Sequence, residues 1–204
     1  MNQTVMDWSH GLSAADFRGL DRLGKASARG LAAAGIVRKY RILDLLADFD
    51  PVIAGTLPIA IDTATSDIDI LCHVTDLETF REFCQGQFGT FDQFSCHERS
   101  ATANVGAAVV VNFVCDDLPI EIFATNHPST AQYGFIHMLV EARILALMGG
   151  GFADEVRALK ESGIKTEPAF ARLLEISGDP YIALAEMIDL SPDQLAAKLH
   201  VTRD

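Results

Sequence analysis

Basic residues are scarce in this sequence. Of its 204 residues, 16 are Lys or Arg and 28 are Asp or Glu, which gives a formal net charge of -12. A protein that binds a nucleic-acid duplex needs a basic stripe to displace counterions, and no such stripe is visible. The same acidic balance disfavours anionic membrane surfaces. We therefore expect neither long nucleic acid nor a membrane among the partners.

Long apolar runs and targeting signals are also missing. The longest apolar stretch, residues 105–111, is broken by Asn112 and is too short to span a bilayer. Residues 1–5 lack the basic start and apolar run of a signal peptide. The cysteines show no Cys-x-x-Cys spacing, which favours buried thiols in a reducing compartment over a zinc site. We expect a cytoplasmic protein whose thiols are Cys72, Cys84, Cys96 and Cys115.

The composition, 49% hydrophobic and 22% charged, is that of a globular protein. Hydrophobic periodicity predicts an α+β fold: a mixed sheet flanked by helices, followed by a helical C-terminal half. Three segments are expected: an N-terminal helical extension over 1–36, an α/β core over 37–128 and a helical region over 129–204. Strands are expected at 52–54, 67–73, 90–97, 107–115 and 119–124. The main helices are expected at 38–49, from 76 to 83 or beyond, and at 129–148, 153–162, 167–174, 180–188 and 192–199.

Residues 1–36 differ from the rest because they are rich in Ala, Gly, Arg and Lys. Ser13 and Asp16 indicate a helix start. Three glycines weaken the helix that would follow, and we expect this extension to pack loosely on the main domain. These glycines are Gly19, Gly24 and Gly30.

Asp67 and Asp69 interrupt what is otherwise a buried strand, Ser66-Asp67-Ile68-Asp69-Ile70-Leu71-Cys72. Residues at i and i+2 of a strand share one face, so the two carboxylates would lie side by side. Buried strands do not tolerate free carboxylates, and such a pair needs a cation. The pattern predicts a metal ion. A surface loop is the alternative, because Asp-x-Asp pairs are common.

Glu121 interrupts a second apolar run, Leu118-Pro119-Ile120-Glu121-Ile122-Phe123. If the two strands are neighbours, all three carboxylates can meet, and their oxygens suit Mg²⁺ or Mn²⁺. Taken alone, Glu121 fits a glutamate that faces water on an edge strand equally well. Gly55-Thr56 ends the first strand, where a glycine turn can aim N–H groups at a phosphate.

These motifs resemble the nucleotidyltransferase superfamily, which has a polymerase beta-like fold. More closely, the chain is similar to an uncharacterised bacterial branch known as domain of unknown function 4269. The resemblance covers roughly residues 38–190 and leaves 1–36 unexplained. The stretches that carry it are Ala54-Gly55-Thr56-Leu57-Pro58-Ile59-Ala60-Ile61-Asp62, Ser66-Asp67-Ile68-Asp69, Ile120-Glu121-Ile122-Phe123, residues 137–143 (HMLVEAR), residues 163–171 (GIKTEPAFA) and Gly178-Asp179-Pro180-Tyr181.

The resemblance implies a sheet of the nucleotidyltransferase type and a metal-dependent transferase. Such an enzyme moves a nucleoside monophosphate from a nucleoside triphosphate to an acceptor, here an unknown small molecule or protein. Asp67 and Asp69 would bind metal, and Glu121 would complete the site and accept the proton of the acceptor. Gly55 and Thr56 would hold the terminal phosphates. Two alternatives stay open: a lapsed nucleotide- or metal-binding regulatory module of the same fold, and a phosphohydrolase.

No Lys or Arg occurs from Ile42 to Phe80, a stretch that holds eight acidic residues. A triphosphate would therefore meet only negative charge unless metal is bound first, and any basic clamp must come from the later chain. The candidates for substrate binding are His137, Arg143 and Lys165, with Arg99 and His97 behind them. The alternatives are a helix-face pair of His137 with Glu141, a structural ion pair for Arg143 and a solvated Lys165.

Overall fold

The computed structural model describes residues 8, 12–102 and 105–200, and these fall into two compact units. Residues 17–60 and 66–135 form one of them, here named the sheet unit. The other, here named the helical unit, comprises the described parts of 1–16, 61–65 and 136–204. These limits do not coincide with the segment boundaries expected after residues 36 and 128.

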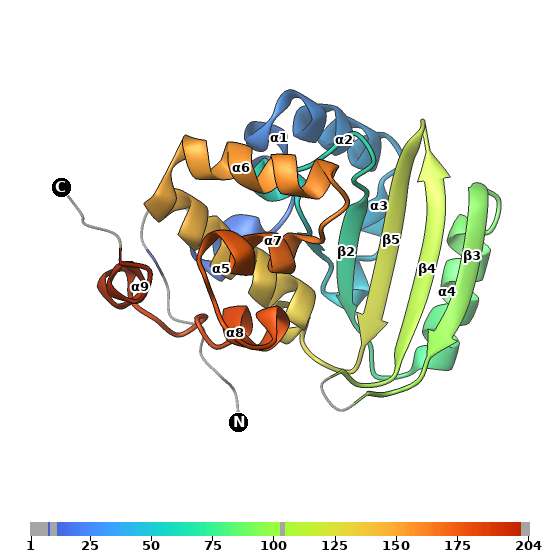
Figure 1. The fold of residues 1–204 in the computed structure, drawn as a ribbon. Coiled ribbons are helices and arrows are strands. Elements are labelled where there is room, and N and C mark those ends of the chain that lie inside the picture. The colour runs from blue at the N-terminus through green and yellow to red at the C-terminus, as the bar shows by residue number, and fades with distance from the viewer. Residues whose placement is uncertain (1–7, 9–11, 103–104, 201–204) are drawn as a thin grey trace. The chain divides into compact units, whose positions relative to one another are not determined.

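The sheet unit is built on five strands in the order β1-β2-β5-β4-β3 (Figure 1). β2 runs parallel to β5, and the other neighbouring pairs are antiparallel, so the sheet is mixed. The predicted α+β class with a mixed sheet is confirmed, and each expected strand is present within two residues of its predicted limits. The strands are β1 Val52–Ala54, β2 Ile68–His73, β3 Asp92–Arg99, β4 Ala108–Cys115 and β5 Leu118–Thr125.

One face of this sheet forms the hydrophobic core. Because side chains alternate along a strand, Ile70, Val111 and Ile122 point to the same side, where all three are buried. Helix α4 (Leu77–Phe88) covers that side, and its Phe88 ring stacks on Phe113 with the centroids 4.9 Å apart. Figure 1 shows α4 behind β3 and β4, so the viewer looks at the opposite face.

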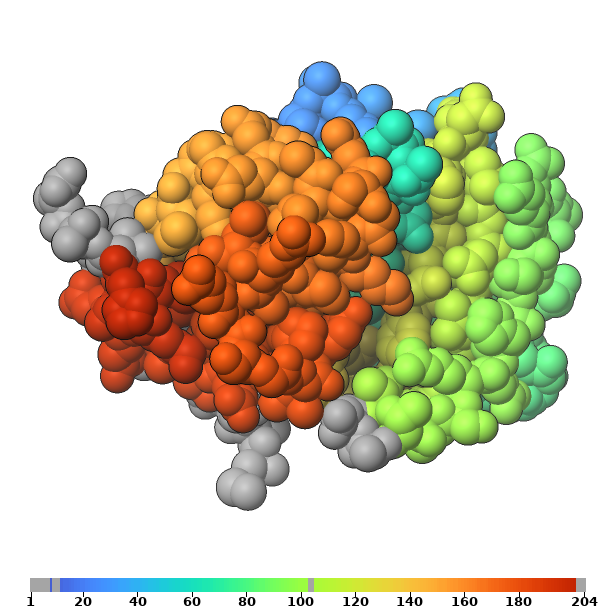
Figure 2. Space-filling model, viewed as in Figure 1, coloured from blue at the N-terminus to red at the C-terminus, as the bar shows by residue number. Residues whose placement is uncertain are grey.

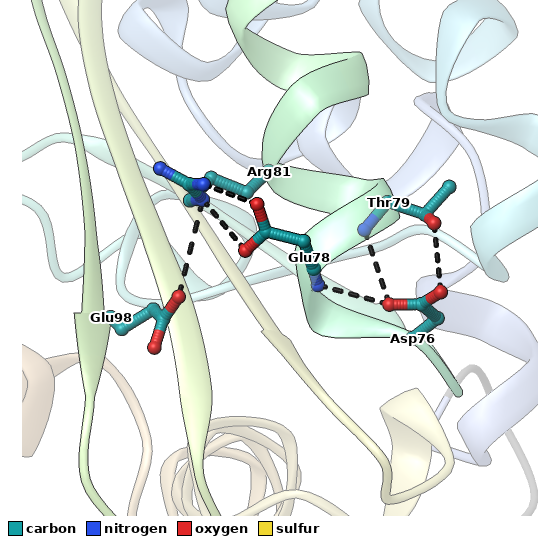
Figure 3. A network of polar contacts seen from close by, with 5 residues as sticks. All are labelled: Asp76, Glu78, Thr79, Arg81 and Glu98. Carbon is teal, nitrogen blue, oxygen red and sulfur yellow. Dashed lines mark hydrogen bonds and ion pairs between the residues drawn. The ribbon is translucent and has the colours of Figure 1, made fainter.

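Helix α4 begins where the sequence predicts. The Asp76 carboxylate accepts hydrogen bonds from the backbone N–H groups of Glu78 (3.1 Å) and Thr79 (3.2 Å) and from the Thr79 hydroxyl (2.7 Å) (Figure 3). These donors, the Thr79 hydroxyl foremost, lower the pKa of Asp76. One turn later Arg81 pairs with Glu78 and lies 4.0 Å from Glu98 of β3. Arg81 therefore links α4 to the edge strand.

From Phe17 onward, the N-terminal segment is part of the core of the sheet unit. A 3-10 turn η1 (Ala14–Phe17) leads to α1 (Asp21–Ala26) and α2 (Ala28–Lys39), which bury Leu23 and Ala33 in the same cluster as the sheet. The expectation of a loosely packed extension is wrong for the described residues from Phe17 onward. Gly30 explains part of the error, because a Cβ there would lie 2.4 Å from the Leu23 carbonyl oxygen. This glycine lets α1 and α2 approach closely.

Two long helices of the prediction are interrupted. The helix expected over 38–49 breaks at Arg41, whose φ of 54° is left-handed, so α2 ends and α3 (Ile42–Leu45) and η2 (Ala47–Phe49) follow. The helix expected over 129–148 starts as a 3-10 turn, η4 (Ser129–Ala131). The extended Gln132 then separates this turn from α5 (Tyr133–Met148), and its side-chain amide donates to the Cys72 carbonyl over 2.8 Å.

The helical unit confirms the predicted helical C-terminal half. It contains α6 (Gly150–Glu161), α7 (Thr166–Leu173), α8 (Pro180–Ala185) and α9 (Pro192–Lys198), and α7 packs against both α6 and α8. Among the residues that the structure describes, no helix is both long and apolar enough to cross a membrane. The expectation of buried thiols is confirmed for three cysteines, with Cys96 only partly buried, and all four are free.

Candidate functional site

Asp69 and Glu121 lie side by side on the face of the sheet opposite α4. The parallel pairing of β2 with β5 places Asp69 in register with Glu121. Residues in register on adjacent strands share a face and lie about 5 Å apart. The two apolar strands that carry acidic residues are therefore neighbours, as the metal hypothesis requires, and the carboxylates meet on one face.

Asp67 lies just before the strand and not within it, because β2 begins at Ile68. The expectation that both aspartates belong to one strand is wrong in this respect, and the Asp67 side chain is exposed. Its charge still acts at the same place. The pKa of Glu121 is raised mainly by burial and secondly by the charge of Asp67. The charge of Asp67 thus acts on Glu121, the residue in register with Asp69.

Gly55 admits the Asp69 carboxylate. Its φ of +80° is a conformation that L side chains rarely adopt, and a Cβ at this position would lie 2.0 Å from Asp69 Oδ2. The sequence predicts a phosphate beside Gly55, and the structure shows the Asp69 carboxylate at this position. Whether a phosphate also binds at this turn stays a prediction.

Thr56 and Ser66 connect the turn after β1 with the turn before β2. The Thr56 hydroxyl donates to Ser66 Oγ over 3.3 Å, and η3 (Leu57–Ile59) follows Thr56. The Ser66 carbonyl accepts a hydrogen bond of 2.6 Å from an Arg29 Nη2 group. Sequence reasoning missed Arg29, because it belongs to α2, far away in the chain. A basic residue therefore does lie next to the acidic turn, and it comes from the earlier chain.

Carboxylate oxygens held on one face are suitable ligands for a hard divalent ion. In Asp69 and Glu121 the sheet unit supplies two such groups in register, with the charge of Asp67 nearby. Among the described residues, no three His, Cys, Asp or Glu side chains are arranged so that they could hold a metal ion together. The donor chemistry fits Mg²⁺ or Mn²⁺, and the complete three-carboxylate site remains a proposal.

Comparison with known families decides the assignment. The model of the domain of unknown function DUF4269 matches residues 35–187, which include every part of the site described above except Arg29. The chain belongs to this family. No curated protein matches the sequence.

Solved structures similar to this DUF4269 protein are distant and larger. The GLD-2/RNP-8 complex matches with a TM-score of 0.47 and 12% identity, over 72% of this chain and 55% of that one. A cytoplasmic RNA terminal U-transferase matches with a TM-score of 0.46 and 13% identity, over 78% and 46%. The structure of mtPAP in complex with UTP matches with a TM-score of 0.40 and 13% identity, over 78% and 36%. The chain thus spans about half the length of the first two.

His137 forms its contacts within the helical unit of the DUF4269 protein. Its Nδ1 lies 3.2 Å from Glu167 Oε1 and its Nε2 lies 2.9 Å from the Tyr181 carbonyl oxygen. The acidic partner is thus Glu167, where sequence reasoning had offered Glu141. The Glu141 side chain is fully buried, which raises its pKa to about 8. A substrate role for His137 stays a prediction.

The structure also gives places to Arg143 and Lys165. The Arg143 guanidinium is fully buried, donates to the carbonyl oxygens of Leu12 (3.2 Å) and Ile188 (2.7 Å), and lies 5.0 Å from the centroid of the Trp8 ring. These contacts favour the structural alternative, although the partners are carbonyls and an aromatic ring in place of a carboxylate. Lys165 is exposed and precedes α7 as its N-cap residue. These observations do not test whether Arg143 or Lys165 binds a substrate.

Proposed function

We propose that this DUF4269 protein is a metal-dependent nucleotidyltransferase that moves a nucleoside monophosphate from a nucleoside triphosphate to an acceptor hydroxyl. The observation that carries the proposal is the register of Asp69 with Glu121 beside the Gly55 turn. Transfer of this kind requires phosphates held in line and charge neutralised by metal, and little covalent work from the protein. The pair of carboxylates in register on the face of the sheet opposite α4 supports the proposal, because such oxygens suit a divalent ion.

Each residue has a distinct part in the proposal. Asp67 and Asp69 would hold Mg²⁺ or Mn²⁺, which would neutralise the charge of the phosphates. Glu121 completes the metal site and accepts the proton of the acceptor hydroxyl, a task that suits a carboxyl whose pKa is raised by burial. Gly55 keeps Asp69 in place, and Arg29 fixes the turn that presents Asp67 through its bond to the Ser66 carbonyl. Gly55 and Thr56 would hold the terminal phosphates of the triphosphate.

The first test is calorimetric binding of ATP, GTP, CTP and UTP with Mg²⁺ and with EDTA. We expect at least one triphosphate to bind only with Mg²⁺, and Asp69→Asn to abolish that binding. The matched control is Asp117→Asn, which neutralises an exposed carboxylate in the β4–β5 turn at a φ of 63°, where Asn is well tolerated. Triphosphate binding that ignores the metal, or that survives Asp69→Asn, would refute the proposal.

The second test separates an enzyme from a binding module without turnover. Pyrophosphate release is followed with the triphosphate that binds and with a panel of acceptors. We expect Glu121→Gln to abolish release, while Glu98→Gln, a change on the strand edge beside Arg81, leaves it unaltered. Metal-dependent binding without any release across the panel would support the regulatory alternative.

A further inference from the structure

A row of residues in register crosses all five strands on the face of the sheet opposite α4, and its members on β2, β5, β4 and β3 are polar. The registers align Ala54, Asp69, Glu121, Asn112 and Ser95, one residue from each strand in sheet order. Neighbouring strands are about 4.8 Å apart, so the row extends about 10 Å beyond Glu121, away from Asp69. The sheet therefore offers a second polar area, over β4 and β3, that the metal site does not use.

Asn112 is the residue of this row next to Glu121. It interrupts the otherwise apolar strand Ala-Val-Val-Val-Asn-Phe-Val-Cys, and it is half-buried beside fully buried Val111 and Phe113. A polar side chain in such a strand is costly unless it has hydrogen-bond partners. An amide can donate to one group and accept from another. Asn112 is thus well placed to orient a hydroxyl toward Glu121.

Two basic residues on β3 share this face. His97 is in register with Val110 and Arg99 with Ala108, and strand alternation puts both on the side of Ser95 and Asn112. The Arg99 guanidinium lies 5.9 Å from the centroid of the Phe123 ring on β5, so this side chain extends across β4 above the small Ala108. Its charge and that of His97 both act on the Glu121 carboxyl.

Both basic residues, His97 and Arg99, are exposed. Figure 2, seen from the same side as Figure 1, shows the green and yellow-green surface of β3 and β4 facing the viewer. In a chain with a net charge of -12, two basic side chains on the face that also carries Glu121 are a local exception to the acidic composition. They suit one compact anionic group, and they are too few to follow a polymer of phosphates.

We propose that the acceptor is a small anionic molecule with a free hydroxyl, bound over β4 and β3 of the sheet unit. Its phosphate or carboxylate group meets Arg99 and His97, and its hydroxyl is held by Asn112 toward Glu121. The proposal rests on the proposed function for its chemistry. The hydroxyl oxygen attacks the α-phosphorus of the triphosphate, the bond to the β-phosphate oxygen breaks, pyrophosphate leaves and the hydroxyl proton passes to Glu121.

The test measures binding without nucleotide or metal, so that it does not depend on catalysis. The probes are glucose 6-phosphate, gluconate and the neutral control glucose, titrated calorimetrically into the full chain. We expect at least one of the anions to bind at least about tenfold more tightly than glucose, because a charge-assisted contact contributes about that factor. Arg99→Gln should remove this preference, and Arg99→Lys should keep part of it.

Two further variants make the result specific. Asn112→Ala should weaken the anionic probe without removing its advantage over glucose, since the amide meets the hydroxyl and not the anion. Arg41→Gln should change nothing, because this exposed arginine on the chain before α3 pairs with Asp44. The proposal is overturned if neither anion outbinds glucose on the wild type, or if Arg99→Gln leaves the preference intact.

These outcomes are independent of the metal site. Anion binding at Arg99 without Mg²⁺-dependent triphosphate binding would remove the proposed function and leave an anion site on β3. Mg²⁺-dependent triphosphate binding without a preference for the anionic probes would support the proposed function and rule out the anion site on β3.

Discussion

At the scale of single residues, Gly55 is the position on which the carboxylate arrangement depends most directly. Its left-handed φ and the 2.0 Å gap between the site of a Cβ and Asp69 Oδ2 leave no room for a side chain. Gly55→Ala must strain the backbone by about 1–2 kcal/mol and displace the Asp69 carboxylate as well. We expect a lower urea midpoint and loss of Mg²⁺-dependent triphosphate binding.

The matched control for this prediction is Gly86→Ala. Gly86 lies inside α4, and a Cβ there meets nothing within 4 Å. Alanine favours a helix over glycine by about 1 kcal/mol, so this variant should gain stability and keep triphosphate binding. If Gly55→Ala behaves like Gly86→Ala, the close approach to Asp69 is not a constraint in solution.

Glu141 ties the stability of the helical unit to pH. Burial and the nearby Glu167 raise its folded pKa to about 8, above the value of about 4.3 expected in an unfolded chain. Between these values the folded state alone holds the proton, so the free energy of unfolding falls as pH rises through this window. The full loss, at most about 5 kcal/mol, is reached above pH 8.

Glu141→Gln replaces the buried acid with a neutral group of the same shape. We expect its unfolding midpoint to exceed that of the wild type by a margin that grows as the pH rises from about 5 to 8, since only the wild type must lose a proton. Glu161→Gln, an exposed change at the end of α6, serves as the comparison. A margin that is constant with pH would mean that Glu141 is already ionised in the folded protein.

At the scale of elements, the sequence predicts strands and helices because their signals are local. Alternation in β5 and the Asp76 cap of α4 can be read within a few residues. Arg41 could not be foreseen, because a left-handed residue that is neither Gly nor Asn leaves no compositional mark. The N-terminal helices were misjudged for a related reason. Gly30 weakens a helix in isolation, and here it permits the contact that holds α2 in the core.

The site was predictable in kind but not in geometry. Acidic residues in apolar strands marked Asp69 and Glu121, since burial of such groups is costly without a partner. Their register follows from the parallel pairing of β2 with β5, two strands separated by about 50 residues, and no local pattern encodes it. The contact of Arg29 with Ser66 and the alignment of Asn112 with Glu121 also join segments that no local pattern connects, so sequence reasoning missed the first and did not predict the second.

At the scale of the whole chain, the division into units also follows from contacts between distant segments. Residues 61–65 lie between β1 and β2 in sequence and yet belong to the helical unit. A hydrogen bond of 2.7 Å from Lys160 Nζ of α6 to the Ile61 carbonyl holds this short segment. Composition alone does not predict that residues 61–65 belong to the helical unit, because a segment of five residues is too short to show a distinct composition.

The net charge of -12 leads to the last prediction, which concerns nucleic acid. Binding to a phosphate polymer is driven by release of counterions from several basic contacts, and here acidic residues outnumber basic ones by 28 to 16. We expect a fluorescent single-stranded RNA of about 20 nucleotides to show no saturable rise in anisotropy at physiological salt, up to roughly 10 µM protein. Saturable binding with a steep dependence on salt would reveal a basic surface of several contacts. The acceptor would then be a polymer, and the proposal that Arg99 and His97 bind one compact anion would be wrong.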